Sequence, residues 1–153
     1  MAHLDLKADN FVFTEDLSLA LLDFGMTESL DAMVKGKKMT SMYRAPEVFE
    51  SVHFAPGPVD IFGIGVCLFK IMVQNVPFMH SDATQYKNYT RYMREQRENL
   101  KYFKAFGIEL SSIEDKAPYR LILRCLNPNP RLRPTIDELL AYEFISGPCE
   151  DAT

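Results

Sequence analysis

The side chains best suited to chemistry stand in three short strings in the first third of the chain. These strings are His3-Leu4-Asp5-Leu6-Lys7-Ala8-Asp9-Asn10, Asp23-Phe24-Gly25 and Ala45-Pro46-Glu47. Their carboxylates and amide offer the hard oxygen ligands that suit Mg²⁺, a carboxylate can accept the proton of a hydroxyl, and a lysine adds a cation. Phosphoryl transfer needs this combination, although each residue taken singly would be an ordinary polar residue of a surface loop.

A β-hairpin is expected to bring the first two strings together. The apolar runs Phe11-Val12-Phe13 and Leu19 to Leu22 are separated by the mostly polar residues Thr14 to Ser18, a pattern typical of two paired strands. The hairpin would place the residues before the first run close to those after the second. Asn10 and Asp23 would then lie at one site.

The rest of the chain is predicted to be a long loop followed by helices. Residues 26–42 show no steady periodicity, and a loop of that length in a compact domain usually has a function. Apolar spacing predicts helices near residues 60–73, 81–100 and 115–126, and a last helix whose capping box is Thr135 with Glu138. The expected fold class is therefore mainly α with a small β-hairpin.

Composition excludes several classes of function. The chain has 153 residues, a net charge of −4 and 47% apolar residues, which is typical of one globular domain. The acidic balance gives no general reason to expect nucleic acid or a membrane as a partner. Six Lys and Arg residues do share the segment 87–104, but Glu95 and Glu98 interleave with them, so this segment is interpreted as a solvated helix face and not as a nucleic-acid patch. The three cysteines form no CxxC pair and no signal peptide is visible, so a cytoplasmic protein with reduced thiols is expected.

The order and spacing of the three strings match the protein-kinase signature. From residue 3 to about residue 145 the chain resembles the C-terminal part of a eukaryotic protein kinase. The resemblance implies that Asp5 is the catalytic base, that Lys7 contacts the γ-phosphate of ATP, and that Asn10 and Asp23 hold Mg²⁺. His3 would be a structural histidine of the loop.

Further matches concern residues that would support the site. Thr40 and Glu47 fit the Thr-x-x-Tyr-x-Ala-Pro-Glu pattern of the substrate-binding segment, Asp60 would hold the backbone of the catalytic loop, and Arg133 would pair with Glu47 in a partly buried ion pair. Gly25 is expected to give the turn after Asp23 its backbone freedom.

The resemblance also suggests the kind of kinase. Lys7 together with Thr40 resembles a serine/threonine kinase, and the later helices are similar to the calcium/calmodulin-dependent group. ATP, Mg²⁺ and a protein with Ser or Thr hydroxyls are the implied ligands. Leu4 stands where many kinases have the arginine that pairs with a phosphorylated activation loop, which argues against that mode of regulation.

Only Met1 and Ala2 precede His3, so the small-lobe parts of a kinase are not found among these residues. We expect a partial kinase fold, the C-lobe without the N-lobe, over residues 1–147, with a tail at 148–153. The missing N-lobe or a partner chain would complete it, and the 153 residues alone should have negligible activity. The alternatives are a catalytically inactive kinase-like interaction module or a remnant.

Overall fold

The computed structural model describes residues 1–35, 41–78, 101–104, 106–109, 113–142 and 145, which form helices and two small antiparallel sheets. The first elements, with η for 3-10 helices, are η1 (Ala8–Asn10), β1 (Phe11–Phe13), β2 (Leu19–Leu21), β3 (Val34–Lys35), η2 (Ser41–Tyr43), α1 (Glu47–Glu50) and β4 (His53–Phe54). The later ones are α2 (Pro56–Val73), α4 (Lys101–Lys104), α5 (Ile113–Cys125), η3 (Pro130–Leu132) and α6 (Ile136–Leu140). The predicted dominance of helix is confirmed for the described part.

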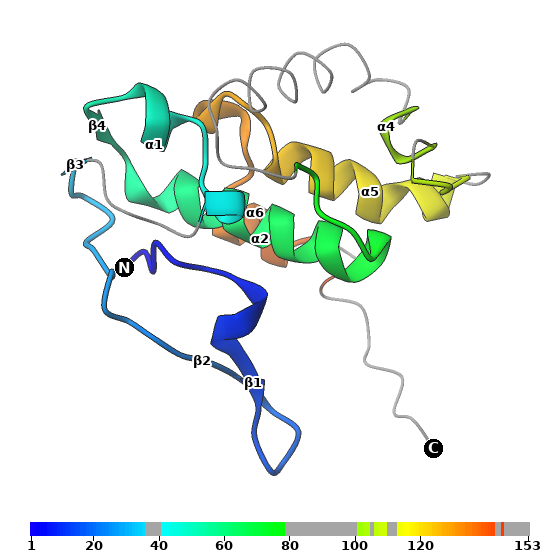
Figure 1. The fold of residues 1–153 in the computed structure, drawn as a ribbon, viewed down its shortest axis with the longest axis horizontal. Coiled ribbons are helices and arrows are strands. Elements are labelled where there is room, and N and C mark those ends of the chain that lie inside the picture. The colour runs from blue at the N-terminus through cyan, green and yellow to red at the C-terminus, as the bar shows by residue number, and fades with distance from the viewer. Residues whose placement is uncertain (36–40, 79–100, 105, 110–112, 143–144, 146–153) are drawn as a thin grey trace.

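The predicted hairpin is present. Strands β1 and β2 pair antiparallel with Phe11 opposite Leu21, and the pair projects away from the helices (Figure 1). At its base the Leu22 amide donates to the Asn10 carbonyl at 2.8 Å. This hydrogen bond joins the last residue of η1 to the residue immediately before Asp23, as the sequence pattern predicts.

The expected long loop over residues 26–42 contains short pairings that the sequence did not predict. Val34 lies opposite Phe54 in the β3–β4 sheet, and Glu28 forms an isolated bridge with Ala2. Strands of two residues are too short to produce a periodic pattern. They nevertheless fasten this segment to the N-terminus and to the start of α2.

Helix α2 is the central core element. It begins at Pro56, four residues earlier than predicted, because Pro is well suited to the first helical position. Phe62, Val66 and Phe69 are fully buried on it, and it packs along α5. Its length and apolar composition would allow it to cross a membrane, as those of a core helix often do, and the fully buried residues favour the core helix.

The remaining helices partly match the predictions. The capping box of α6 is confirmed: the Thr135 hydroxyl accepts from the Glu138 amide at 3.2 Å, and the Glu138 carboxylate accepts from the Thr135 amide at 2.8 Å. Helix α5 begins at residue 113, two residues earlier than predicted, and Pro118 lies inside it. The predicted helix at 81–100, Thr40 and the tail at 148–153 lie outside the described residues.

An apolar cavity of about 870 Å³ separates the N-terminal segment from the helices. Leu6, Phe24 and Leu30 line one side, and Ile61, Ile64 and residues 130–131 and 133–136 line the other. Phe24 and Leu30 are more than half exposed. An open apolar surface of this extent is typical of a site of association or of dye binding.

We therefore expect the purified chain to bind a dye such as anilinonaphthalene sulfonate at this cavity. Ile64→Gln, which places an amide in the cavity wall, should reduce the dye fluorescence to about half or less. The matched control is Ile71→Gln on the same helix, where the side chain is 64% exposed and does not line the cavity. Equal fluorescence from both variants, or no dye binding by the unmodified chain, would contradict this assignment.

Candidate active site

Asp60 on α2 holds the loop of residues 3–10. Its carboxylate accepts hydrogen bonds from the amides of His3 at 2.5 Å and Leu4 at 2.7 Å. Burial raises the pKa of Asp60, and the two amide donors oppose that rise. The backbone of Leu4 is left-handed, with φ of 66°, which a bulky side chain seldom adopts. The two amide hydrogen bonds fix that conformation, and the expected role of Asp60 in holding the loop backbone is confirmed.

Helix α2 and the loop approach each other closely one turn further along α2. A Cβ atom built on Gly63 would lie 3.2 Å from both the Cβ and the carbonyl oxygen of Leu6. A side chain at position 63 would therefore push the loop outward. Glycine at this position allows Asp60 to reach the loop amides.

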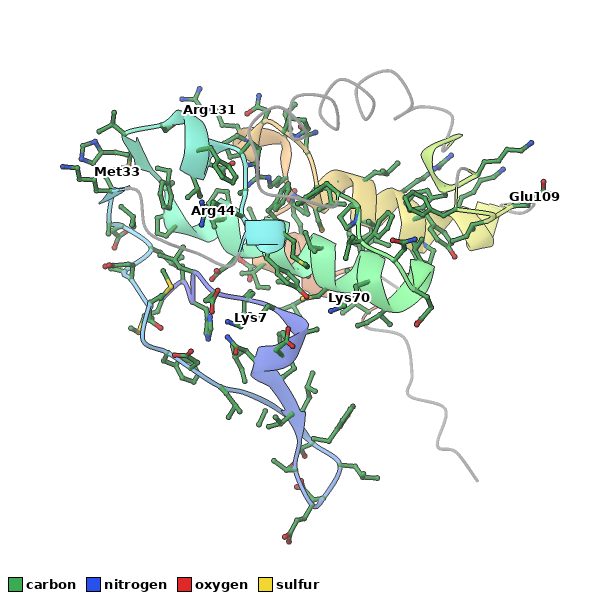
Figure 2. All side chains as sticks on the ribbon, in the orientation of Figure 1. Lys7, Met33, Arg44, Lys70, Glu109 and Arg131 are labelled. Carbon is green, nitrogen blue, oxygen red and sulfur yellow. The ribbon has the colours of Figure 1, made fainter. Side chains whose placement is uncertain are left out.

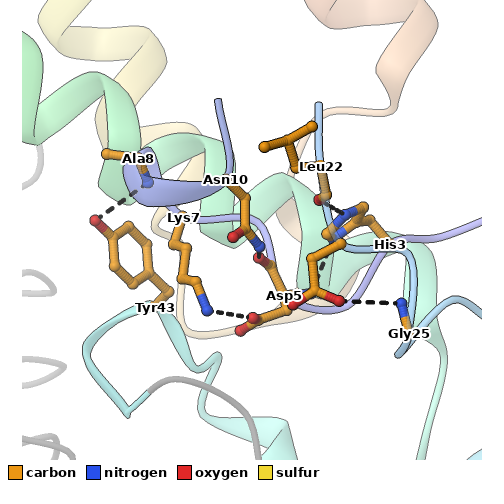
Figure 3. Close-up of polar contacts among 9 residues, drawn as sticks. His3, Asp5, Lys7, Ala8, Asn10, Leu22, Gly25 and Tyr43 are labelled. Carbon is orange, nitrogen blue, oxygen red and sulfur yellow. Dashed lines mark hydrogen bonds and ion pairs between the residues drawn. The ribbon is translucent and has the colours of Figure 1, made fainter. Parts of the chain in front are cut away.

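His3 connects the loop to the end of the hairpin (Figure 3). Its Nε2 lies 2.9 Å from the Leu22 carbonyl oxygen, and its Nδ1 accepts from the Asp5 amide at 3.2 Å. This pattern fits a neutral imidazole with its proton on Nε2. The ring also packs edge-on against Phe24 at 5.2 Å between centroids. His3 thus positions Asp5 and the chain next to Asp23 simultaneously.

Asp5 and Lys7 form an ion pair within the loop. Lys7 Nζ donates to Asp5 Oδ2 at 2.5 Å, and both side chains remain partly exposed. The hydrogen bond to Asp5 raises the pKa of Lys7, and the charges of Asp23 and Asp9 add to the rise. Lys7 therefore stays protonated at neutral pH, where it can bind an anion that approaches Asp5.

Asp23 follows the hairpin at an exposed position. Its φ is 61°, a left-handed conformation that Asp tolerates better than most residues. Gly25 was predicted to give this turn its backbone freedom, and that reason is wrong. Gly25 has no positive φ, and the left-handed residue of the turn is Asp23. Gly25 instead donates its amide to Asp23 Oδ1 at 3.3 Å, and a Cβ there would lie 3.2 Å from the same oxygen.

The oxygen donors near Asp23 fit a hard divalent cation. Asn10 is buried and uses its amide nitrogen to donate to the Asp5 carbonyl at 2.9 Å, so its side-chain oxygen is the atom available to bind a cation. Together with the Asp23 carboxylate this is an oxygen-only donor set, which suits Mg²⁺. Among the described residues no three His, Cys, Asp or Glu side chains gather in a metal-binding cluster.

The predicted pair of Glu47 and Arg133 is present and buried. Arg133 donates to both carboxylate oxygens of Glu47, at 2.6 and 2.7 Å. The same guanidinium donates to the carbonyls of Pro58 at 2.7 Å and Asn127 at 2.9 Å. It also lies over the Phe62 ring at 4.9 Å. This pair anchors the start of α1 to the chain beyond α5.

Tyr43 and Lys70 also belong to the surroundings of the site, and Lys70 was not predicted. The Tyr43 hydroxyl accepts from the Ala8 amide at 3.4 Å and from Lys70 Nζ at 3.5 Å. The sequence feature that could have indicated it is a lysine in the mostly apolar stretch of residues 61–73. Leu4 is 2% exposed and belongs to the apolar core. An apolar, buried side chain therefore stands where the resemblance leads one to expect an arginine that pairs with a phosphorylated loop.

Comparison with known proteins agrees with this geometry. A family model described as protein kinase domain matches residues 1–145. The chain is 31% identical over 148 residues to serine/threonine-protein kinase ppk34 of Schizosaccharomyces pombe, covering 94% of the chain and 38% of that protein. It is 28% identical over 155 residues to testis-specific serine/threonine-protein kinase 2 of Mus musculus, covering 97% and 40%.

A third relative is described differently. A Dictyostelium discoideum protein that is 27% identical over 153 residues is named as a probable inactive serine/threonine-protein kinase, and the match covers 92% of the chain and 12% of that protein. The chain spans about two-fifths of the length of the first two relatives.

Proposed function

Because the chain belongs to the protein kinase domain family, we propose that it supplies the catalytic and metal-binding part of a serine/threonine protein kinase. Its substrate would be a protein Ser or Thr hydroxyl and its phosphate donor ATP with Mg²⁺. We further propose that residues 1–147 form the large lobe of such a kinase, with a tail at 148–153, and that its kinase group is the calcium/calmodulin-dependent one.

One observation carries this proposal: a single loop presents Asp5, Lys7 and Asn10, and the hairpin brings Asp23 to the same place. Bound Mg²⁺ and ATP would supply the transferable phosphoryl group and neutralise its charge. Asp23 and the Asn10 side-chain oxygen would hold the metal. The Asp5 carboxylate would accept the proton of the substrate hydroxyl, and the Lys7 ammonium would offset the charge that develops on the phosphoryl oxygens.

Regulation by phosphorylation of the segment between Asp23 and Glu47 is not part of the proposal. Leu4 is apolar and buried, so this position offers no cation to a phosphate group. Among its described residues, Val34 and Lys35 are held by the β3–β4 pairing and Glu47 by its ion pair. These contacts need no covalent modification.

The test is to supply a kinase small lobe. The 153 residues alone should give negligible phosphorylation, because positioning of the nucleotide accounts for much of the catalysis. The same residues fused behind the small lobe of a related kinase should phosphorylate a peptide with one Ser at a rate approaching the family's range of about 1–100 s⁻¹. A twin peptide with Tyr in place of Ser should remain unmodified.

A catalytically inactive interaction module is the second candidate. The open apolar cavity next to the site favours it, since such a surface fits association with another protein. A properly folded fusion that binds ATP but transfers no phosphate would select this alternative. Transfer to Tyr instead of Ser would refute the serine/threonine assignment alone.

A further inference from the structure

Lys70 is a charged residue in the core helix that forms no ion pair with an acidic side chain among the described residues. It and Asp60 are the two charged residues of α2, and Asp60 binds the amides of the loop. The Lys70 side chain is half-buried. Within the part of the chain that the structure describes, Lys70 Nζ has the Tyr43 hydroxyl, at 3.5 Å, as its polar partner and pairs with no carboxylate.

The other cations near the site differ in this respect. Lys7 is paired with Asp5, and Arg133 is paired with Glu47. An ammonium group that loses part of its hydration without gaining a carboxylate lowers the stability of the fold. Such a group is more useful when a ligand completes its contacts, because its remaining N–H donors can then bind an incoming anion.

The position of Lys70 connects it to the proposed active site. The Tyr43 hydroxyl that it contacts also accepts from the Ala8 amide, one residue after Lys7. The Tyr43 hydroxyl therefore connects Lys70 to the loop that bears Asp5 and Lys7. Figure 2 shows Lys70 on the side of α2 where Lys7 lies. A peptide that presented a hydroxyl to Asp5 would pass close to this ammonium group.

Asp9 supplies the opposing charge on the same side. The buried thiol of Cys67, one turn before Lys70 on α2, has a pKa raised to about 11 by burial, and Lys70 lowers that pKa while Asp9 raises it. Lys70 and Asp9 are therefore both close enough to Cys67 to change the pKa of its thiol. Asp9 is exposed, and its negative charge disfavours an acidic side chain along the loop, whereas the positive charge of Lys70 favours one.

We propose that Lys70, oriented by the Tyr43 hydroxyl, forms a subsite that selects protein substrates with an acidic side chain near the Ser or Thr to be phosphorylated. This inference rests on the proposed function, because it assigns the substrate class of the same site. Lys70 is a specificity residue in this arrangement and takes no part in the chemical step.

The test measures peptide binding to the 153-residue chain by fluorescence anisotropy, with no nucleotide present. The probes are twin peptides with one central Ser, in which a single Glu or a single Lys occupies each flanking position in turn. At one position the Glu peptide should bind about tenfold more tightly than its Lys twin, as expected for a charge-assisted contact of a half-buried ammonium group. Lys70→Met should remove this preference, and Lys70→Glu should reverse it.

The control variant is Lys35→Glu, which makes the same change of charge at an exposed residue of β3. Because its charge is exposed and screened by salt, it should leave the affinity of each twin, and therefore their ratio, nearly unchanged. Lys70→Met keeps the apolar part of the side chain, and its circular dichroism should match that of the unmodified chain. A ratio near one at every position, or a ratio that Lys70→Met leaves intact, would overturn the proposal.

This readout separates the subsite from the proposed function. A preference for Glu that depends on Lys70, with no phosphorylation by the small-lobe fusion, would retain the subsite as a peptide-binding feature and reject the kinase activity. Phosphorylation by the fusion with no preference at any position would reject the subsite alone.

Discussion

Arg133→Met is expected to lower the free energy of unfolding by about 3–5 kcal/mol. The substitution leaves the Glu47 carboxylate buried without its two guanidinium donors, and the carbonyls of Pro58 and Asn127 lose the same partner. A total stability of about 5–15 kcal/mol is usual for a domain, so this loss would be a large fraction of it. Urea unfolding followed by circular dichroism measures the change.

Two further variants separate the ion pair from the packing of its atoms. Arg131→Met alters an exposed residue of η3 two positions away and should cost less than about 0.5 kcal/mol. The double variant Arg133→Met with Glu47→Leu removes both charges and should be more stable than Arg133→Met alone, because no uncompensated charge remains. A loss below about 1 kcal/mol for Arg133→Met would show that the pair behaves as an exposed one.

Asp5→Asn and Asp23→Asn are each expected to reduce phosphorylation by the small-lobe fusion by a factor of about 10² to 10⁴. Both changes keep the shape of the side chain and remove its charge. The first removes the group that would accept the hydroxyl proton, and the second removes an anionic metal ligand. Initial rates of transfer to the Ser peptide at saturating ATP measure the effect.

Asp31→Asn is the matched control for these two substitutions. Asp31 is exposed in the segment after Asp23, and it makes no contact with the loop of residues 3–10 among the described hydrogen bonds. Its variant should retain the unmodified rate. Activity that survived Asp5→Asn or Asp23→Asn would mean that the roles carried over from the family are wrong for this chain.

The elements that depend on local patterns could be predicted from the sequence. Two short apolar runs on either side of a polar segment are enough to predict β1 and β2. The Thr135–Glu138 capping box marks the start of α6 because both hydrogen bonds lie within four residues. The β3–β4 pair could not be predicted, because each strand has two residues and its partner is about twenty residues away. Helix α1 has four residues and is equally short for a periodic signal.

In the candidate site, too, features set by neighbouring residues could be predicted, and features set by residues far apart in the sequence could not. The identities of Asp5, Asn10 and Asp23 follow from short strings in a fixed order. The left-handed backbone of Leu4 could not be predicted, because leucine disfavours it and a carboxylate more than fifty residues away stabilises it. The contact of Lys70 with Tyr43 depends on how α2 packs against η2, which no local pattern reports.

The ion pair of Glu47 and Arg133 also sets an order of events during chain synthesis. The two residues are 86 positions apart, and at a typical elongation rate Arg133 is added roughly 4 to 17 seconds after Glu47. Through that interval Glu47 is a carboxylate without its guanidinium partner, so α1 cannot be anchored in its final place. The loop of residues 3–10 can be fastened earlier, once Asp60 is available to its amides. The proposed base can therefore reach its position once Asp60 has been made, whereas the end of the substrate-binding segment reaches its position only after Arg133 has been added.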